Sequence, residues 1–409
     1  MSDSCAPDFG GQAVFKPNKE TQNGVKCGKM HYPEMDLMRG IAILMVLLYH
    51  SILVYPVNLV ETYPACEVLH SFLWNVEMPV FFLVSGFCLT YKGGYFPYLG
   101  KKTLRILVPH IVFGLLDITI RAVATTAVSS TGSWVDGLID FLLYGGSDWF
   151  LLTLFIMMLI APVLYLLMHK GRAVRIVVTA AVILLYLFQN KIPGFLSARN
   201  VVIFLPFFVF GMLFRIRKDN CGGKKEAGDG QKILAKTLIK LLISLVLGVG
   251  LFVLMRWEGW NGQPQHWEAI FTGNDFMMGV RDFLAQELWP GLDILRIKLI
   301  YLSGILLGQL FMIIAVYELS LILTRIVKGR ILMECSRFSL QMYLLDGYAL
   351  VATRVLLVSI AHVMNPWVLI PVNFVIDTLI IYLIAKFLLN RWKITRILTG
   401  IPDGDGSKK

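Results

Sequence analysis

Runs of about 20 apolar residues recur along this chain from Leu37 almost to its end, and each run is long enough to cross a lipid bilayer as a helix. The mean hydropathy is +0.68 and only 16% of the residues are charged, whereas soluble proteins carry about a quarter. The sequence therefore predicts an all-α, polytopic membrane protein with no soluble domain, whose chemistry must be built within the bilayer.

About ten transmembrane helices are expected, packed as one bundle. They cover residues 36–56, 68–91, 105–128, 149–168, 173–189, 200–215, 234–256, 297–325, 338–361 and 366–389. A polar N-terminal tail, 1–35, and a basic C-terminal tail, 391–409, would flank a transmembrane domain over 36–390. The first 35 residues contain no early apolar segment with a cleavage site, so no signal peptide is expected.

Lysines and arginines are distributed unevenly between the connecting segments. If the N-terminus is cytoplasmic, the inside segments hold 27 Lys and Arg and the outside segments hold six. Because membrane proteins keep cations on the cytoplasmic side, we expect a multi-pass protein of the cell (inner) membrane with both termini in the cytoplasm. The net charge of +11 is scattered through short loops, which argues against a nucleic-acid partner.

Arg39 and His50 lie in the first expected span, eleven residues apart. At about 100° per residue both project from nearly the same helix face, roughly 16 Å apart along the axis. Arg39 would stand at the cytoplasmic mouth and His50 past the midplane. Arg39 could simply follow the charge bias, and His50 could be a hydrogen-bonded interior histidine. Imidazole is also the side chain best suited to exchange a proton near neutral pH.

Two carboxylates are expected at a similar depth. Glu77 and Asp346 each stand nine residues from the start of a span, roughly 13 Å into the membrane from opposite sides. Ionisable groups are expensive in lipid, so they face a bundle interior or a wet cavity. His50, Arg39, Glu77 and Asp346 are therefore candidate catalytic residues of a reaction chamber, or alternatively the groups of an ion path.

Other polar features support simpler interpretations. Asp117 and Arg121 are four residues apart on one helix, so a structural ion pair is expected. The six cysteines lack the spacing of metal ligands, so no metal site and no permanently bound cofactor are expected.

Five segments resemble the membrane-bound acyltransferase-3 family: "MDLMRGIAILMVLLYH", "MPVFFLVSGFCLTY", "KKTLRILVP", "DWFLLTLF" and "FSLQMYLL". Within that family the sequence is most similar to the O-acetyltransferases of the fucose 4-O-acetylase-like group. The most specific element is an Arg, ten residues, then a His, which Arg39 and His50 match. Lys102 stands where relatives carry Arg, and Glu77 and Asp346 stand where relatives often carry His.

The resemblance implies that an acyl group, expected to be acetyl, passes from cytoplasmic acyl-CoA to a hydroxyl of a cell-surface carbohydrate or its lipid-linked precursor. Arg39, Lys101, Lys102 and Arg105 would hold the phosphates of the donor at the cytoplasmic mouth. His50 would act as general base on the acceptor hydroxyl or would carry the acyl group itself.

Candidate acceptor contacts follow from the same resemblance and from aromatic content. Ser85 lies in the "FFLVSGF" segment and Trp149 in "DWFLL", and Trp260 belongs to a Trp-rich outer segment whose rings could stack on sugars. These tryptophans could instead form the aromatic belt of the membrane interface.

The competing interpretation is a proton-coupled transporter or exporter of a small metabolite, using the same buried His and carboxylates. Transporters often show repeated halves with broken helices in matching positions, and the sequence shows no such repeat. A sensor or scaffold would not need so many ionisable groups in mid-membrane.

Overall fold

Every regular element in the described part of this computed structural model is a helix, as predicted. The described residues are 31–53, 59–123, 134–220, 230–256, 294–326, 330–357 and 365–401. Everything below concerns the chain from Pro33 onward, which forms one unit separate from residues 1–32.

The first half of the chain alternates long helices with short turns. Its elements are α1 (Pro33–Ser51), α2 (Leu59–Thr62), α3 (Pro64–Phe87), α4 (Tyr95–Lys102), the π-helical turn η1 (Thr103–Leu107), α5 (Val108–Val123), α7 (Trp134–Tyr144), the 3₁₀ turn η2 (Gly146–Asp148), α8 (Trp149–His169), α9 (Arg172–Leu187), the 3₁₀ turns η3 (Gln189–Lys191) and η4 (Phe195–Ser197), and α10 (Ala198–Asn220).

The second half continues the pattern with longer helices. Its elements are α11 (Gly230–Arg256), α14 (Ile294–Ile326), α15 (Arg330–Arg337), α16 (Ser339–Leu357), α17 (Pro366–Leu383), the π-helical turn η7 (Ile384–Leu389) and α18 (Lys393–Leu398).

Seven helical segments in the described residues are long and apolar enough to cross a membrane. They are Pro64–Phe87, Tyr95–Ile120, Trp134–His169, Phe195–Asn220, Gln231–Met255, Leu299–Arg325 and Pro366–Leu389. The other three predicted spans correspond to α1, α9 and α16. Helices α1 and α16 contain charged residues that lower their hydropathy, and α9 is only 16 residues long, so these three are not among the seven. The multi-span helical architecture is confirmed, and the total of ten stays a prediction.

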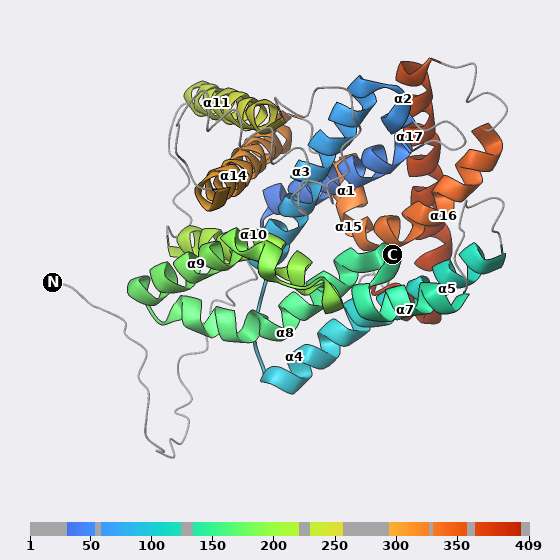
Figure 1. Cartoon of the computed structure of the whole chain (residues 1–409), viewed down its shortest axis with the longest axis horizontal. Helices are drawn as coiled ribbons and strands as arrows, with labels where there is room; N and C mark the ends of the chain where they lie inside the picture. The colour runs from blue at the N-terminus through green and yellow to red at the C-terminus, as the bar shows by residue number, and fades with distance from the viewer. Residues whose placement is uncertain are drawn as a thin grey trace, which may run out of the picture. The chain divides into compact units, whose positions relative to one another are not determined.

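Helix α1 occupies the middle of the bundle. It packs against α3, α14, α15, α16 and α17, and Figure 1 shows α1 and α3 between the α11–α14 pair and the α16–α17 pair. Gly40 lets α15 approach, because a Cβ there would collide with the carbonyl oxygen of Leu332. Small residues at such crossings let membrane helices pack closely. The helix with the predicted Arg and His is thus enclosed by partners.

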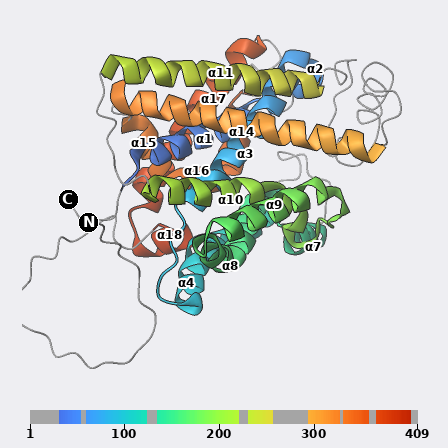
Figure 2. The ribbon, with the colours of Figure 1, turned by 90° about the vertical axis from the view of Figure 1, so that its left-hand side faces the viewer.

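Helices α11 and α14 run side by side, as two views agree (Figures 1 and 2). Gly248 and Gly304 lie at their contact, where an added Cβ would press on Met312 and Met255. Only 11% of the apolar window of α11 is buried by the rest of the chain. A face this apolar suits contact with lipid.

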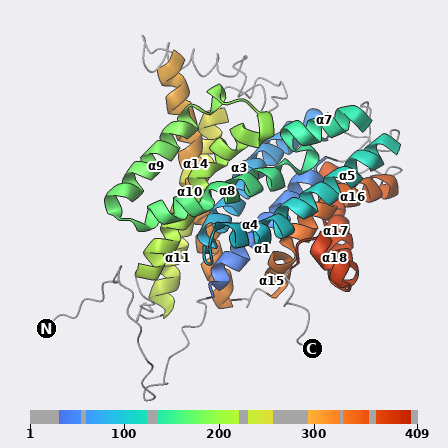
Figure 3. The same ribbon diagram turned by 90° about the horizontal axis from the view of Figure 1, so that it is seen from below.

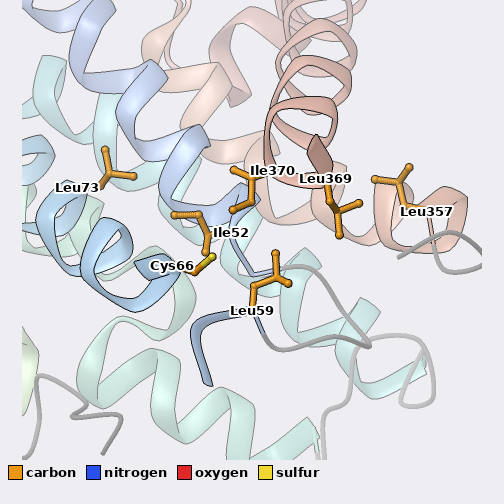
Figure 4. Close-up of a cluster of buried hydrophobic side chains, with 7 residues drawn as sticks. All are labelled: Ile52, Leu59, Cys66, Leu73, Leu357, Leu369 and Ile370. Carbon is orange, nitrogen blue, oxygen red and sulfur yellow. The ribbon is translucent and has the colours of Figure 1, made fainter. Parts of the chain in front are cut away.

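A cluster of buried apolar side chains closes the bundle just past the end of α1 (Figure 4). Ile52 follows α1, and its neighbours come from α2, α3, α16 and α17: Leu59, Cys66, Leu73, Leu357, Leu369 and Ile370. Asn373 of α17 also donates to the backbone oxygen of Ser51, at 3.0 Å. These contacts fix the end of α1, and with it His50.

The segment predicted as a basic C-terminal tail is helical where it is described. Helix α18 lies beyond the end of α17 (Figure 3) and contacts α5 and η1. The Gln341 side chain donates to the backbone oxygen of Thr399 at 2.7 Å. Gly400, at φ +72°, approaches Arg105 so closely that a Cβ would lie 2.5 Å from its carbonyl oxygen. Residues up to Ile401 therefore pack on the bundle.

Candidate functional site

The His50 imidazole meets the Asp346 carboxylate between α1 and α16. Nδ1 of His50 contacts Oδ2 of Asp346, and their side chains are 30% and 4% exposed. The sequence predicted similar depths for the two groups but not that their helices are neighbours. A carboxylate that accepts from Nδ1 leaves Nε2 as the basic nitrogen. The pair can therefore take a proton from a molecule that reaches Nε2.

Glu77 joins this pair from α3. Its side chain is fully buried, and its charge interacts with those of His50 and Asp346. Neither Glu77 oxygen has a hydrogen-bond partner among the described residues. A carboxyl group enclosed in this way is costly as an isolated anion. Three of the four predicted catalytic groups thus converge from three helices.

Aromatic rings pack beside His50. Tyr49 stacks on His70 with ring centroids 3.9 Å apart, and its ring lies 4.9 Å from His50 and 5.6 Å from Trp74. Trp74 in turn lies 5.6 Å from Trp149. Trp149, a predicted substrate contact, is placed among these rings and on Phe204. It lies on the wall of neither cavity described below.

One cavity, of about 310 Å³, gathers cations, and we call it the basic cavity. Its wall includes Arg39 of α1, Lys102 and Arg105 at the α4–η1 junction, and Arg337 at the end of α15. None of the residues that the structure places on this wall is an Asp or Glu. The cavity can therefore attract a polyanion such as a phosphate-bearing donor.

Several predicted site residues are brought together here, and one is not. Arg39, Ser85, Lys102 and Arg105 all line the basic cavity, whereas Lys101 is exposed and lies outside it. The π-helical turn η1 follows Lys102 directly, and π-turns inside helices are frequent at functional sites. The Lys102 ammonium lies 5.4 Å from the centre of the Tyr98 ring.

The position of Arg39 is set by its own helix and by α3. Its guanidinium donates to the Cys88 sulfur at 3.6 Å and lies 4.0 Å from the Asp36 carboxylate. Gly86 allows α10 to pack closely behind this wall, because a Cβ there would collide with the Phe208 carbonyl. The small residues of "FFLVSGF" thus make room for helix packing as well as for the cavity.

A second cavity, of about 210 Å³, holds His50 together with three carboxylates, and we call it the acidic cavity. Asp346, Asp117 and Asp148 line it, with Ser147 and Tyr348. Ser147 donates to Asp117 at 2.8 Å, and Tyr348 donates to the backbone oxygen of Phe113 at 2.8 Å. Carboxylates in a small cavity are acceptors for hydroxyl groups.

The turn before α8 places Ser147 and Asp148. Gly145 and Gly146 precede them with φ of +93° and +59°, a conformation that favours glycine. Sequence reasoning singled out neither Ser147 nor Tyr348 and assigned no role to Asp148. The glycine pair ahead of "SDW" was the available signal for this turn.

Two earlier predictions lie outside the described residues. The Arg121 side chain, the expected partner of Asp117, is one, and Trp260 is the other.

The two cavities lie toward opposite ends of α1. The basic cavity is lined by residues near the start of α1 and the end of α3, and the acidic cavity by residues near the end of α1. Tyr343 of α16 contributes to both walls. The arrangement offers one chamber for an anion and another for a hydroxyl-bearing molecule, with a proton-accepting pair beside the second.

A comparison with family models decides the class of the protein. The model described as an acyltransferase domain, that of the acyltransferase-3 family, matches residues 32–386. The chain belongs to the acyltransferase-3 family. It is accordingly a membrane acyltransferase. No curated protein and no solved structure matches the chain.

Proposed function

We propose that this membrane acyltransferase transfers an acyl group, acetyl in the simplest case, from acyl-CoA to a carbohydrate hydroxyl. The observation that carries the proposal is the His50–Asp346 pair, which lines the acidic cavity, while Tyr343, three residues before Asp346 on α16, lines both that cavity and the basic cavity. Acyl-CoA is the donor whose chemistry fits the basic cavity, because its phosphates match Arg39, Lys102, Arg105 and Arg337.

The acceptor would lie in the acidic cavity. Carboxylates accept hydrogen bonds from hydroxyl groups, so Asp117 and Asp148 can orient a sugar or the sugar of a lipid-linked precursor. A volume of about 210 Å³ suits a small portion of such a molecule. The resemblance of the sequence to fucose 4-O-acetylases makes a fucose-bearing oligosaccharide the first acceptor to try.

The reaction then follows from the groups present. Nε2 of His50 takes the proton of the acceptor hydroxyl, and the oxygen attacks the thioester carbonyl. The C–O bond of the new ester forms, the C–S bond breaks, and the thiolate leaves with a proton returned from the imidazolium. Asp346 stabilises that imidazolium, and Glu77 adjusts the charge around the pair.

The alternative chemical route is covalent, with His50 carrying the acyl group between the two cavities. The routes differ in one observable. Labelled acetyl-CoA given without acceptor would leave label on the protein by the covalent route and none by the base route.

The test uses the purified protein in detergent with labelled acetyl-CoA and fucose-bearing oligosaccharides. The wild type should label the acceptor, and His50→Ala should not, at equal folded yield. His169→Ala is the matched control, because His169 lies at the far end of α8 and on neither cavity wall. No gradient exists in detergent, so a proton-coupled transporter would transfer no label. A folded His50→Ala protein working at the wild-type rate would refute the role of His50.

A further inference from the structure

We propose that Tyr343 is the barrier between the two cavities, a positioning residue whose ring keeps the donor and acceptor chambers apart. Among the described residues it is the only one on the walls of both. The catalytic role of this barrier rests on the proposed function, but the presence of the barrier can be tested without measuring acyl transfer.

The position of Tyr343 along α16 explains why it touches both chambers. Ser339 and Leu340, about one helical turn earlier, line the basic cavity, and Asp346, about one turn later, lines the acidic cavity beside His50. A helical turn rises about 5.4 Å, so the ring stands at the level where the two spaces approach each other. Removing it would join them.

Helix α8 holds the ring in place. The Tyr343 ring lies 5.2 Å from the Phe150 ring, and its hydroxyl lies near enough to the Phe150 backbone to interact with it. Phe150 is itself fixed against Phe82, at 5.1 Å, and against Phe81, at 5.7 Å. A ring packed in this way against a line of aromatic side chains makes a firm partition.

The hydroxyl end of Tyr343 also senses the acidic groups. The charges of Asp148, Asp346 and Glu77 all act on it. The Tyr343 ring therefore packs on α8 and forms part of the wall of the basic cavity. Its hydroxyl also interacts with the charges of Asp346 and its neighbours. Loading either chamber can disturb its hold on α8.

A partition at this place has two chemical consequences. It keeps water of the acidic cavity from the thioester, whose hydrolysis would form a C–O bond to water, break the C–S bond and release carboxylic acid and thiol. It also interrupts a continuous water path, along which protons would otherwise cross the bilayer. During turnover the ring must turn aside to let the acyl carbon and the acceptor oxygen meet.

The test reconstitutes wild type, Tyr343→Ala and Tyr343→Phe in liposomes with an internal pH-sensitive dye. After a pH step, Tyr343→Ala should leak protons several-fold faster than wild type, because the two cavities join. Tyr343→Phe keeps the ring and should stay as tight as wild type. Tyr343→Leu, which preserves apolar packing on Phe150, decides the question if the alanine protein does not fold, and it should also leak.

The second measurement uses acetyl-CoA without acceptor. Tyr343→Ala should release free thiol several-fold faster than wild type, while Tyr343→Phe should not. Folded Tyr343→Ala and Tyr343→Leu proteins that are as proton-tight as wild type would overturn the barrier. A wild type that never transfers an acyl group would instead refute the proposed function, and the leak result would still stand.

Discussion

Four cations reach the basic cavity from three separate stretches of the chain, and they differ in what surrounds them. Arg39 is held by Cys88 and Asp36, and Lys102 lies over the Tyr98 ring. Arg105 is more exposed than Lys102, yet both line the cavity. Lys101 is adjacent to Lys102 in sequence, but it is exposed and does not line the cavity. This contrast supplies a matched control for donor binding.

Arg105→Ala should raise the KM for acyl-CoA while leaving kcat nearly unchanged. A hydrogen bond to a charged group contributes about 1.5–3 kcal/mol, and exposure of Arg105 favours the low end, so the expected rise is about tenfold. Lys102→Ala should act in the same direction. Steady-state kinetics over a range of acetyl-CoA concentrations gives both constants.

The control for that prediction is Lys101→Ala, which removes the same charge from the same turn of chain. Its KM should remain within about twofold of wild type. Equal effects of the Lys101 and Arg105 substitutions would mean that the charges act only through the general field or through membrane topology.

Part of the site could be predicted at this scale. Counting helical rise placed His50, Glu77 and Asp346 at one depth, and the resemblance selected Arg39, Ser85, Lys102 and Arg105. Tyr343 and Asp148 fall within two of the resembling segments but were given no role, and Arg337 had no signal, because their importance comes from which helices are neighbours. Hydrophobic periodicity gives a buried face but not the identity of the helix packed against it.

At the scale of elements, glycines decide how closely helices approach. At Gly86 an added Cβ would collide with the Phe208 carbonyl, and at Gly211 it would collide with the Leu83 carbonyl. Both belong to the contact between α3 and α10. The obstacle in each case is backbone, which cannot move aside as a flexible side chain can.

Gly86→Ala should therefore destabilise the protein. Overpacking costs about 1–3 kcal/mol and exceeds the gain in helix propensity of at most about 1 kcal/mol. A Cβ added at Gly250 on α11 would meet no atom within 4 Å, so Gly250→Ala should only gain the higher helix propensity of alanine. Thermal unfolding in detergent should show a lower midpoint for Gly86→Ala and an unchanged or higher one for Gly250→Ala. The reverse order would contradict the packing assigned to α3 and α10.

Gly400→Ala tests whether the C-terminal segment belongs to the basic cavity. Gly400 and Ile401 line it, and the positive φ and the nearby Arg105 carbonyl both oppose a side chain. The displaced segment should loosen Arg105 and raise the KM for acetyl-CoA several-fold. Gly100→Ala, on α4 with open space around it, is the control. An unchanged KM in a folded Gly400→Ala protein would show that this segment does not contribute to binding of the donor.

The helices themselves were largely predictable, but their ends were not. The third span was expected to begin at residue 105, whereas its helical run starts with α4 at Tyr95, after Gly94 at φ +92°. The Lys and Gly residues of this stretch, together with Pro97, indicated a connecting segment rather than part of a span. Conversely, α1 was expected to reach residue 56 but ends at Ser51. There Asn373 donates a hydrogen bond to the Ser51 carbonyl, and Ile52 packs into the apolar cluster.

At the scale of the whole molecule, the two cavities give the bundle a direction. We propose that the basic cavity faces the cytoplasm, because the segments on its side belong to the set that holds 27 of the Lys and Arg, against six on the other side. Acyl-CoA is cytoplasmic, so this orientation puts the donor at the cations and the acceptor at the opposite face. Each cavity then serves one aqueous compartment.

Sided membrane vesicles test this central claim most directly. Labelled acetyl-CoA is loaded inside right-side-out vesicles, on the cytoplasmic face, and an impermeant fucose-bearing oligosaccharide is added outside. The account predicts label on the external acceptor with the wild type, none with His50→Ala, and none when acetyl-CoA is supplied only outside. Equal labelling with donor and acceptor both outside, or undiminished labelling with folded His50→Ala, would contradict it.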